Sequence, residues 1–180
     1  MTTYCQYVLE NPEDQYNKRY HDTEYGFPIQ DDNLLFERLI LEINQAGLSW
    51  ITILKKADNF RRAYDGFDIK TVAGYGESDR ERLLSDAGII RNKLKVNAAI
   101  VNAQRILELK EEFGSFKGWL DTHHPRTKDE WVKLFRGNFK FVGGEIVNEF
   151  LMSTGYLLGA HEESCPIFPQ IKALNPPWTI

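Results

Sequence analysis

The sequence predicts an all-α protein, and two observations support this prediction. Residues that begin and end helices recur along the whole 180-residue chain. No stretch alternates apolar and polar side chains for long enough to indicate a half-buried β-strand. A chain of this length suits a single domain, residues 1–180, which we expect to consist of two packed helical lobes.

Two helices are predicted in the first part of the chain, on either side of a short break. The first spans residues 34–46, follows the aspartate pair 31–32 and ends at Gly47. The second spans residues 50–64 and follows Ser49, a residue type that commonly caps helices. The chain between them is therefore expected to form a tight corner.

A shorter helix and then a long one are predicted in the middle of the chain. Ser78 and Glu81 have the spacing of a capping box before residues 80–87, and Gly88 is expected to end that helix. The long helix spans about residues 92–113 and stops at the glycine that follows.

The last third of the chain predicts two more helices. Thr127 and Glu130 have capping-box spacing before residues 131–135 (WVKLF). Residues 145–154 form the second helix, which ends at Gly155.

Two segments are not expected to continue a helix. Residues 123–126 contain a proline and separate two of the predicted helices. Residues 169–180 are interrupted by prolines, so we expect this tail to lie over the surface or to fray.

The composition limits the classes of protein to consider. The net charge is -4, so a nucleic-acid-binding protein of this composition must gather its positive charge on one face. Aromatic residues make up 13% of the chain, which favours a heavy core or a pocket that stacks on flat ligands. No apolar run reaches the roughly 18–20 residues that span a bilayer, and residues 1–15 lack the pattern of a secretion signal. We therefore expect a cytoplasmic protein without a membrane partner.

Four metal-ligand residues lie near the two ends of the chain. They are Cys5, His21, His161 and Cys165, and the last two have the spacing His-x3-Cys. Two thiolates and two imidazoles complete a tetrahedral zinc shell with no position for water, so such a site would be structural. The alternative is a pair of small buried cysteines and two surface histidines. A disulfide between the cysteines is not expected in a reducing compartment.

Residues 83–99, within a unit of about 79–113, have the pattern of a helix-hairpin-helix. The turn around Gly88 would expose backbone N–H groups, and the next helix would present its positive N-terminal end. Both features favour a DNA phosphate without reading base sequence. The alternative is an ordinary corner between two helices.

Basic residues cluster in three places along the chain. The hairpin carries Arg91, Lys93 and Lys95, and further positive charge occurs within residues 133–140 and at residues 55–56. These clusters would form a DNA-facing surface if they converge. The alternative is a set of separate solvated edges.

Glu42 is the candidate pocket acid. At 100° per residue it falls at the border of the apolar face of the helix 34–46. A carboxylate at that border suits a pocket, although a glutamate whose head reaches water is the alternative. The polar side of the helix is expected to hold Glu37, Arg38, Asn44 and Gln45.

The corner after this helix has the composition of a DNA wedge. Gln45 and Leu48 are expected to point outward around Gly47, with Trp50 just inside the next helix. Such a corner can enter the gap that an everted base leaves in a duplex. The alternative is a plain corner whose leucine and tryptophan belong to the core.

Four segments of the chain resemble the DNA-3-methyladenine glycosylase I family. They are YHDTEYGFP (20–28), LFERLILEINQAGLSWITILKK (35–56), DAGIIRNKLKV (86–96) and NFKFVG (138–143). The resemblance implies an all-α fold of the helix-hairpin-helix glycosylase superfamily and a structural zinc on Cys5, His21, His161 and Cys165. It also implies a monomer that binds double-stranded DNA with alkylated bases, in the cytoplasm and on the nucleoid. The implied reaction is hydrolysis of the N-glycosidic bond of 3-methyladenine, without a lysine nucleophile.

The resemblance also implies roles for individual residues. Glu42 becomes the acid that recognises the base. The residues that contact the base are Tyr20, Trp50, Tyr7 and Tyr16. The residues that contact DNA are Gln45, Gly47 and Leu48 at the corner, and Gly88, Arg91 and Lys93 at the hairpin. No group is assigned to activate water.

The chain departs from the family pattern near the pocket. Ile43 and Asn44 follow the pocket acid where a small residue is usual, and Tyr7 and Tyr25 replace tryptophans. These departures leave two rival functions open. One is a zinc-stapled DNA-binding protein without glycosylase activity, and the other is a glycosylase for a different alkylated purine.

Overall fold

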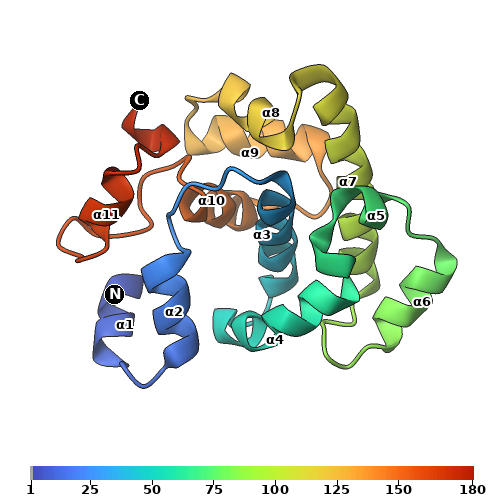
Figure 1. Ribbon diagram of the computed structural model, residues 1–180, viewed down its shortest axis with the longest axis horizontal. Helices are drawn as coiled ribbons and strands as arrows, with labels where there is room; N and C mark the ends of the chain where they lie inside the picture. Colours follow the sequence, from blue (N-terminus) through green and yellow to red (C-terminus); the bar gives the residue numbers. More distant parts are fainter. Residues whose placement is uncertain (1) are drawn as a thin grey trace.

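A computed structural model describes residues 2–180, which form helices and no strand (Figure 1). The all-α prediction is therefore confirmed. None of the described helices is long and apolar enough to cross a membrane. In chain order the elements are α1 (Tyr4–Glu10), α2 (Gln15–Thr23), α3 (Asp32–Gln45), α4 (Trp50–Ala63), η1 (Asp65–Phe67), α5 (Ile69–Ala73), α6 (Glu77–Ser85), α7 (Lys93–Phe113), α8 (Phe116–His123), α9 (Lys128–Asn138), α10 (Gly144–Ser153), α11 (Phe168–Lys172) and η2 (Pro177–Thr179).

Helix α3 lies at the centre of the fold and is buried all round. The elements packed against it are α4, α5, α7, α8, α10 and η1, and every residue in 35–44 is buried. The prediction that Glu37, Arg38 and Asn44 lie on a polar, exposed side of this helix is therefore wrong. Each of these side chains has a polar partner in the interior, which offsets the cost of taking it out of water.

The helix ends that depend on local chemistry are where the sequence predicts them. The Asn92 side chain accepts the N–H of Lys95 at the start of α7, and Gly114 ends that helix with a φ of 83°. At the start of α9, Thr127 and Glu130 form the predicted reciprocal capping box. These contacts need only residues close in sequence, so the pattern alone is sufficient to place them.

The start of α6 differs from the prediction. The helix begins at Glu77, so Ser78 lies inside its first turn and does not cap it. The Asp79 carboxylate instead accepts the N–H of Gly76, at 3.0 Å. Gly88 does not terminate the helix, which ends at Ser85, but lies in the turn beyond it.

Five α-helices are absent from the sequence predictions, namely α1, α2, α5, α8 and α11. Each has nine residues or fewer, which is too short for an apolar period to identify it. The tail lies over the surface rather than fraying, because the Trp178 N–H donates to the Gly155 carbonyl and the Trp178 and Phe168 rings stack at 5.8 Å.

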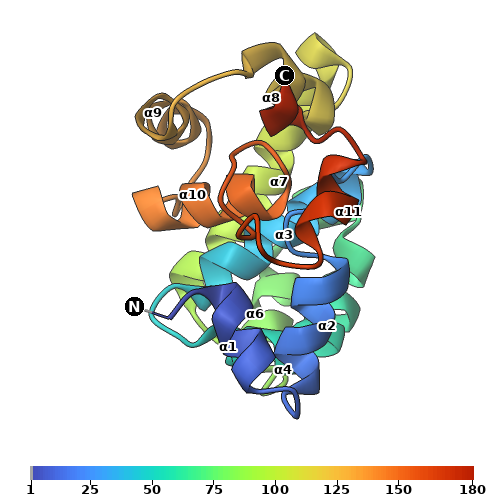
Figure 2. The same cartoon turned by 90° about the vertical axis from the view of Figure 1, so that its left-hand side faces the viewer.

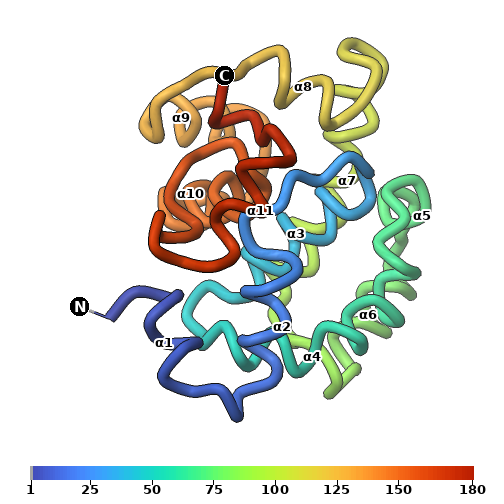
Figure 3. Tube along the Cα trace, turned by 60° about the vertical axis from the view of Figure 1, so that its left-hand side comes forward, coloured from blue at the N-terminus to red at the C-terminus, as the bar shows by residue number. Residues whose placement is uncertain are grey.

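The two ends of the chain lie side by side. Figure 2 shows α11 above α2, and Figure 3 shows α1, α2 and the segment after α10 on one side of the molecule, with α5 and α6 on the other. Gly26 allows this close approach: its φ is 85°, and a Cβ there would lie 2.9 Å from the Ala160 Cβ. Segments far apart in sequence therefore share one surface.

Lys95 connects the start of α7 to the corner after α3. Its Nζ donates to the carbonyl oxygens of Asn44, at 2.8 Å, and Ala46, at 2.7 Å, and its side chain is buried. The expectation that Lys95 adds to an exposed basic edge is therefore wrong. The ammonium satisfies carbonyls at the C-terminal end of α3, where a positive charge is favourable.

We predict that Lys95→Met destabilises the fold by about 2–3 kcal/mol, because two carbonyls lose a charged donor and have no substitute. Urea unfolding measures this change. The matched control is Lys93→Met on the same helix, which removes an exposed ammonium and should change the free energy of unfolding by less than about 0.5 kcal/mol. Equal losses in the two variants would contradict the role given to Lys95.

Candidate functional site

A cavity of about 410 Å³ opens where α1, α2, α3, α4 and α10 meet. We call it the aromatic cavity. Its wall consists of aromatic rings, three carboxyl groups and one amide, from Tyr4, Tyr20, Tyr25, Glu42, Gln45, Trp50, Glu145 and Glu149. A space of this size and flat lining suits a ligand the size of a nucleobase.

Glu42 is the most deeply buried acid of the aromatic cavity. It projects from α3, its side chain is 4% exposed, and no hydrogen-bond donor within residues 2–180 reaches its carboxyl group. Burial raises the pKa of Glu42 to about 8, and the nearby charge of Glu149 acts in the same direction. The guanidinium of Arg38 opposes this shift but is bonded elsewhere, to the Ser153 carbonyl. Glu42 is thus an acid without a partner, held away from water.

Tyr20 and Trp50 form an aromatic corner beside this acid. Their rings lie 5.0 Å apart at 59°, and the Arg38 guanidinium lies 5.1 Å from the centre of the Tyr20 ring. The Tyr20 hydroxyl and the Trp50 indole N–H are both buried without a hydrogen-bond partner. Orphaned polar atoms that line a cavity indicate a ligand that would satisfy them.

Tyr4 and Tyr25 complete the aromatic wall. The Tyr25 ring lies 5.5 Å from that of Tyr20 and 5.3 Å from that of Tyr4. The Tyr25 hydroxyl donates to Glu149 Oε2, at 3.2 Å. Tyr4, Glu145 and Glu149 were not singled out by the sequence analysis. The i, i+4 spacing of the two glutamates on α10 is the pattern that places them on one face.

The structure does not bring Tyr7 and Tyr16 into the aromatic cavity. Tyr7 is on the exposed side of α1, and its hydroxyl donates to Asp14 Oδ2 at 3.0 Å. Tyr16 is 52% exposed, one turn before Tyr20 on α2, and its ring faces the Lys55 ammonium at 5.9 Å. Tyr4 and Tyr25 therefore take the positions around the cavity that the sequence analysis expected for these two rings.

The corner after α3 lies next to the aromatic cavity. Gln45 lines the cavity and its amide donates to the Leu48 carbonyl, at 2.7 Å. Gly47 has a φ of 81°, which turns the chain outward, and the Leu48 side chain is 39% exposed. The corner thus presents an apolar side chain to solvent beside the opening to the buried acid.

The hairpin between α6 and α7 presents two free basic side chains. Arg91 and Lys93 are exposed. The Gly88 N–H is engaged, because it donates to Asp86 Oδ1 at 2.7 Å, and the Lys56 ammonium donates to the Ala87 carbonyl. The basic segment 133–140 begins on α9, which Figure 1 places away from α6, but its last residue reaches α7, because the Lys140 N–H donates to Asn102 Oδ1 at 2.7 Å. The ring of the next residue, Phe141, lies 6.0 Å from the Lys95 ammonium near the start of α7.

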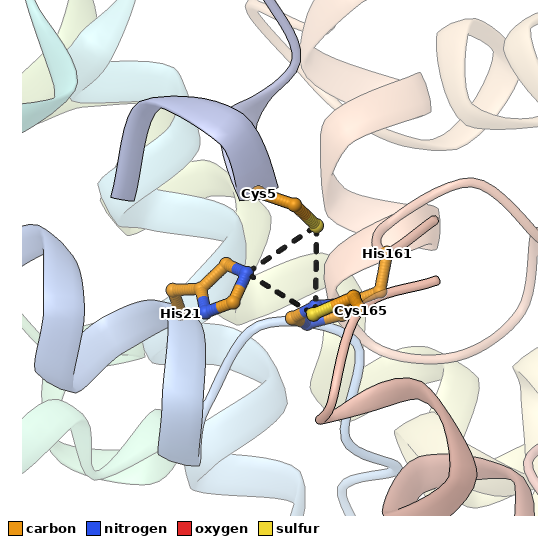
Figure 4. Close-up of side chains that lie close together, drawn as sticks. All are labelled: Cys5, His21, His161 and Cys165. Atoms are coloured by element: carbon orange, nitrogen blue, oxygen red, sulfur yellow. Dashed lines mark hydrogen bonds between the residues drawn. The ribbon is translucent and has the colours of Figure 1, made fainter. Parts of the chain in front are cut away.

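Cys5, His21, His161 and Cys165, which we call the Cys–His cluster, meet in one buried place (Figure 4). The four ligand atoms lie within 4.8 Å of one another. The sulfur-to-nitrogen distances are 3.3 and 3.6 Å from Cys5, and 3.4 and 3.7 Å from Cys165. The cysteines are not bonded to each other.

The chemistry of the Cys–His cluster fits a metal ion. Asp22 binds Nδ1 of His21 at 2.8 Å, and the Tyr25 carbonyl binds Nε2 of His161 at 2.7 Å. These contacts leave the other ring nitrogen of each histidine facing the cysteines with a lone pair. Burial raises the pKa of the Cys5 thiol to about 11, so a thiolate here needs a cation to balance it. The cluster is therefore a candidate metal site.

Known proteins of one family are similar to this chain. The sequence pattern of the Methyladenine glycosylase family matches residues 10–134. DNA-3-methyladenine glycosylase 1 of Escherichia coli (strain K12) is 39% identical over 172 residues, which are 85% of this chain and 91% of that protein. DNA-3-methyladenine glycosylase of Haemophilus influenzae is 35% identical over 185 residues, which are 92% of this chain and 98% of that protein.

Solved structures have the same fold. A crystal structure of 3-methyladenine DNA glycosylase I (TAG) has a TM-score of 0.78 at 35% identity, with 86% of this chain and 94% of that one covered. A structure of TAG from Staphylococcus aureus, solved to explain 3-methyladenine recognition, has a TM-score of 0.79 at 31% identity. The match covers 86% of this chain and 92% of that chain. The helical arrangement is thus shared over most of both chains.

We predict that the charge of Glu42 makes folding less favourable as pH rises. Its folded-state pKa of about 8 lies above the ordinary value of 4.5. Stability that is fully present below about pH 4.5 is therefore lost as pH rises toward the folded-state value. Glu42→Gln should match the wild type near pH 5 and exceed it by a few kcal/mol near pH 9, as measured by urea unfolding.

The matched control is Glu10→Gln at an exposed position of α1. Its free energy of unfolding should stay parallel to that of the wild type across the same range of pH. A Glu42→Gln variant that also runs parallel to the wild type would show that the Glu42 carboxyl is not desolvated.

Proposed function

The chain belongs to the methyladenine glycosylase family, and from this premise we propose that it removes 3-methyladenine from alkylated double-stranded DNA. It is a DNA glycosylase, a hydrolase that acts on N-glycosidic bonds. The observation that carries the proposal is the aromatic cavity, where a buried acid without a partner faces rings that stack on a base. The relatives and the solved structure described above are named for the same lesion.

The aromatic cavity suits an everted purine that carries positive charge. The rings of Tyr20 and Trp50 attract a cationic base more strongly than a neutral one. An oxygen of Glu42 accepts a hydrogen bond from the exocyclic amine, and a cation in the cavity favours the ionised form of this acid. The base also gives the orphaned Tyr20 hydroxyl and Trp50 N–H a partner. A normal adenine lacks the charge and is bound less well.

The lesion itself supplies much of the reactivity. Alkylation at N3 places a positive charge on the base, so breaking the glycosidic bond releases a neutral molecule. Among residues 2–180, the lining of the aromatic cavity contains no lysine, so a covalent amine intermediate is not expected and water completes the reaction. The protein must evert the nucleotide, hold the base and exclude competing neutral bases.

The corner and the hairpin are the proposed DNA contacts. Leu48 at the corner, beside the mouth of the cavity, fills the gap in the duplex, with Gln45 and Gly47 shaping the turn. Arg91 and Lys93 bind phosphates next to Gly88 at the start of α7. Lys95 holds the corner and the start of α7 together, so both contacts form at a set spacing.

We propose that the Cys–His cluster holds a structural zinc ion. Zinc accepts two thiolates and two imidazoles in a tetrahedron. With ordinary zinc–sulfur and zinc–nitrogen bond lengths, each sulfur would lie about 3.5 Å from each nitrogen. The four such distances in the cluster range from 3.3 to 3.7 Å. All four protein ligands are needed to fill the shell, so no position remains for a reacting water. The ion would tie α1 and α2 to the segment after α10.

We predict that the purified protein contains about one zinc per chain and that Cys165→Ser loses it. Because the ion binds only the folded chain, its loss should lower the thermal midpoint by roughly 10 °C. Elemental analysis and calorimetry measure the two effects. Thr3→Ser near the cluster is the control, and its zinc content should stay that of the wild type. A zinc-free wild type of unchanged stability would contradict the site.

We predict that Glu42→Gln lowers the rate of 3-methyladenine release from methylated DNA about 100-fold or more, because a neutral amide does not stabilise a cationic base. Chromatography of the released bases measures the rate. Glu37→Gln on the same helix, whose acid pairs with Arg61 outside the cavity, should keep most of the activity. DNA binding with no base released by the wild type would instead favour the binding-protein function, and release of another purine would favour a different lesion.

A further inference from the structure

Glu149 is an acid of the aromatic cavity to which neither the family resemblance nor the base-recognition argument gives a role. We propose that Glu149 is a second catalytic residue, the anion that faces the glycosidic bond and takes a proton from the attacking water. This inference rests on the proposed glycosylase function. The observation that supports the inference is the position of Glu149, between the mouth and the bottom of the aromatic cavity.

Three carboxyl groups line the aromatic cavity at increasing depth. The Glu145 side chain is 88% exposed, Glu149 follows one turn later on α10 and is half-buried, and Glu42 is 4% exposed. A nucleotide that enters such a cavity places its base at the bottom and its sugar at the mouth. The bond between base and sugar then lies at the depth of Glu149.

A buried hydroxyl holds the Glu149 carboxyl in place. The Tyr25 hydroxyl donates to Oε2 at 3.2 Å, and the Tyr25 side chain is 7% exposed between the rings of Tyr4 and Tyr20. The Lys128 ammonium reaches Glu145 at 3.5 Å and forms no ion pair with Glu149. One oxygen of Glu149 is therefore anchored, and the other has no hydrogen-bond partner within residues 2–180 that would keep it from substrate.

Glu42 and Glu149 differ in how easily they ionise. With the pKa of Glu42 near 8, Glu42 holds a proton at neutral pH in the empty cavity. Burial and the Glu145 charge raise the pKa of Glu149, while the Tyr25 hydrogen bond and the Lys128 charge oppose that shift. Glu149 is less buried than Glu42 and accepts a hydrogen bond, whereas Glu42 accepts none from the described part of the chain, so Glu149 is the acid of the pair that is more easily ionised. The orphaned Tyr20 hydroxyl and Trp50 N–H in the same cavity are separate evidence that a ligand belongs there.

The chemistry balances with these groups. The bond between C1′ and the base nitrogen breaks, and its electron pair goes to the cationic base, which leaves neutral. The sugar carbon gains positive charge, which the Glu149 carboxylate stabilises across a space with little water. A water oxygen then bonds to C1′ and gives one proton to Glu149, which passes it to solvent. No other reactant is required.

The test compares Glu149→Gln with the wild type in single-turnover release of 3-methyladenine. We expect a loss of about 100-fold in the chemical step. A second measurement uses duplexes with a tetrahydrofuran or a cationic pyrrolidine in place of the lesion. Glu149→Gln should bind the neutral analogue as the wild type does and lose about tenfold in its preference for the cationic one. Retained binding of the neutral analogue shows that the variant folds.

Two further variants separate a local role from a general charge effect. Glu112→Gln removes an exposed acid on α7, outside the cavity, and should leave the rate unchanged. Glu145→Gln at the solvated mouth should lower it less than Glu149→Gln does, and equal losses would overturn the proposal. A wild-type rate and an unchanged analogue preference in Glu149→Gln would overturn it while the glycosylase function stands. No base release by the wild type would overturn both.

Discussion

The burial of α3 on every side is the constraint on which the rest of the structure depends. A helix with one solvated face would let the Glu42 head reach water, and its carboxyl would be an ordinary surface acid. Because packed elements surround α3, the carboxyl has only the aromatic cavity to face. A desolvated acid without a partner is unfavourable in the empty protein, and it suits a site that recognises a cation.

The Cys–His cluster and the aromatic cavity are built from neighbouring residues of the same elements. His21 follows Tyr20 directly on α2, and the His161 Nε2–H donates to the backbone carbonyl of Tyr25, at 2.7 Å. The residues that gather the two ends of the chain are therefore neighbours of the rings that line the cavity. A metal ion in the cluster would set the positions of α1 and α2, and with them most of the aromatic wall.

Lys95 joins the proposed DNA-facing surface to the interior. Its ammonium is bonded to carbonyls at the end of α3, while Arg91 and Lys93, two to four residues earlier, are exposed at the hairpin. The corner with Leu48 and the start of α7 are thereby held against each other. The proposed phosphate binding at the hairpin and the proposed insertion at the corner would then act together at one place on the duplex.

The sequence by itself determined the helical class and the helix ends at Asn92 and Thr127. The family resemblance predicted Glu42 as the pocket acid, and the structure places this residue in the wall of the aromatic cavity. Capping contacts join residues three or four apart, so a local pattern contains all the information they need. Only the tertiary structure decided that Lys95 is buried, that Tyr4 and Tyr25 line the cavity, and that Glu149 stands beside Glu42. Those facts depend on which elements surround a side chain, and a helical pattern records only the period of a single helix.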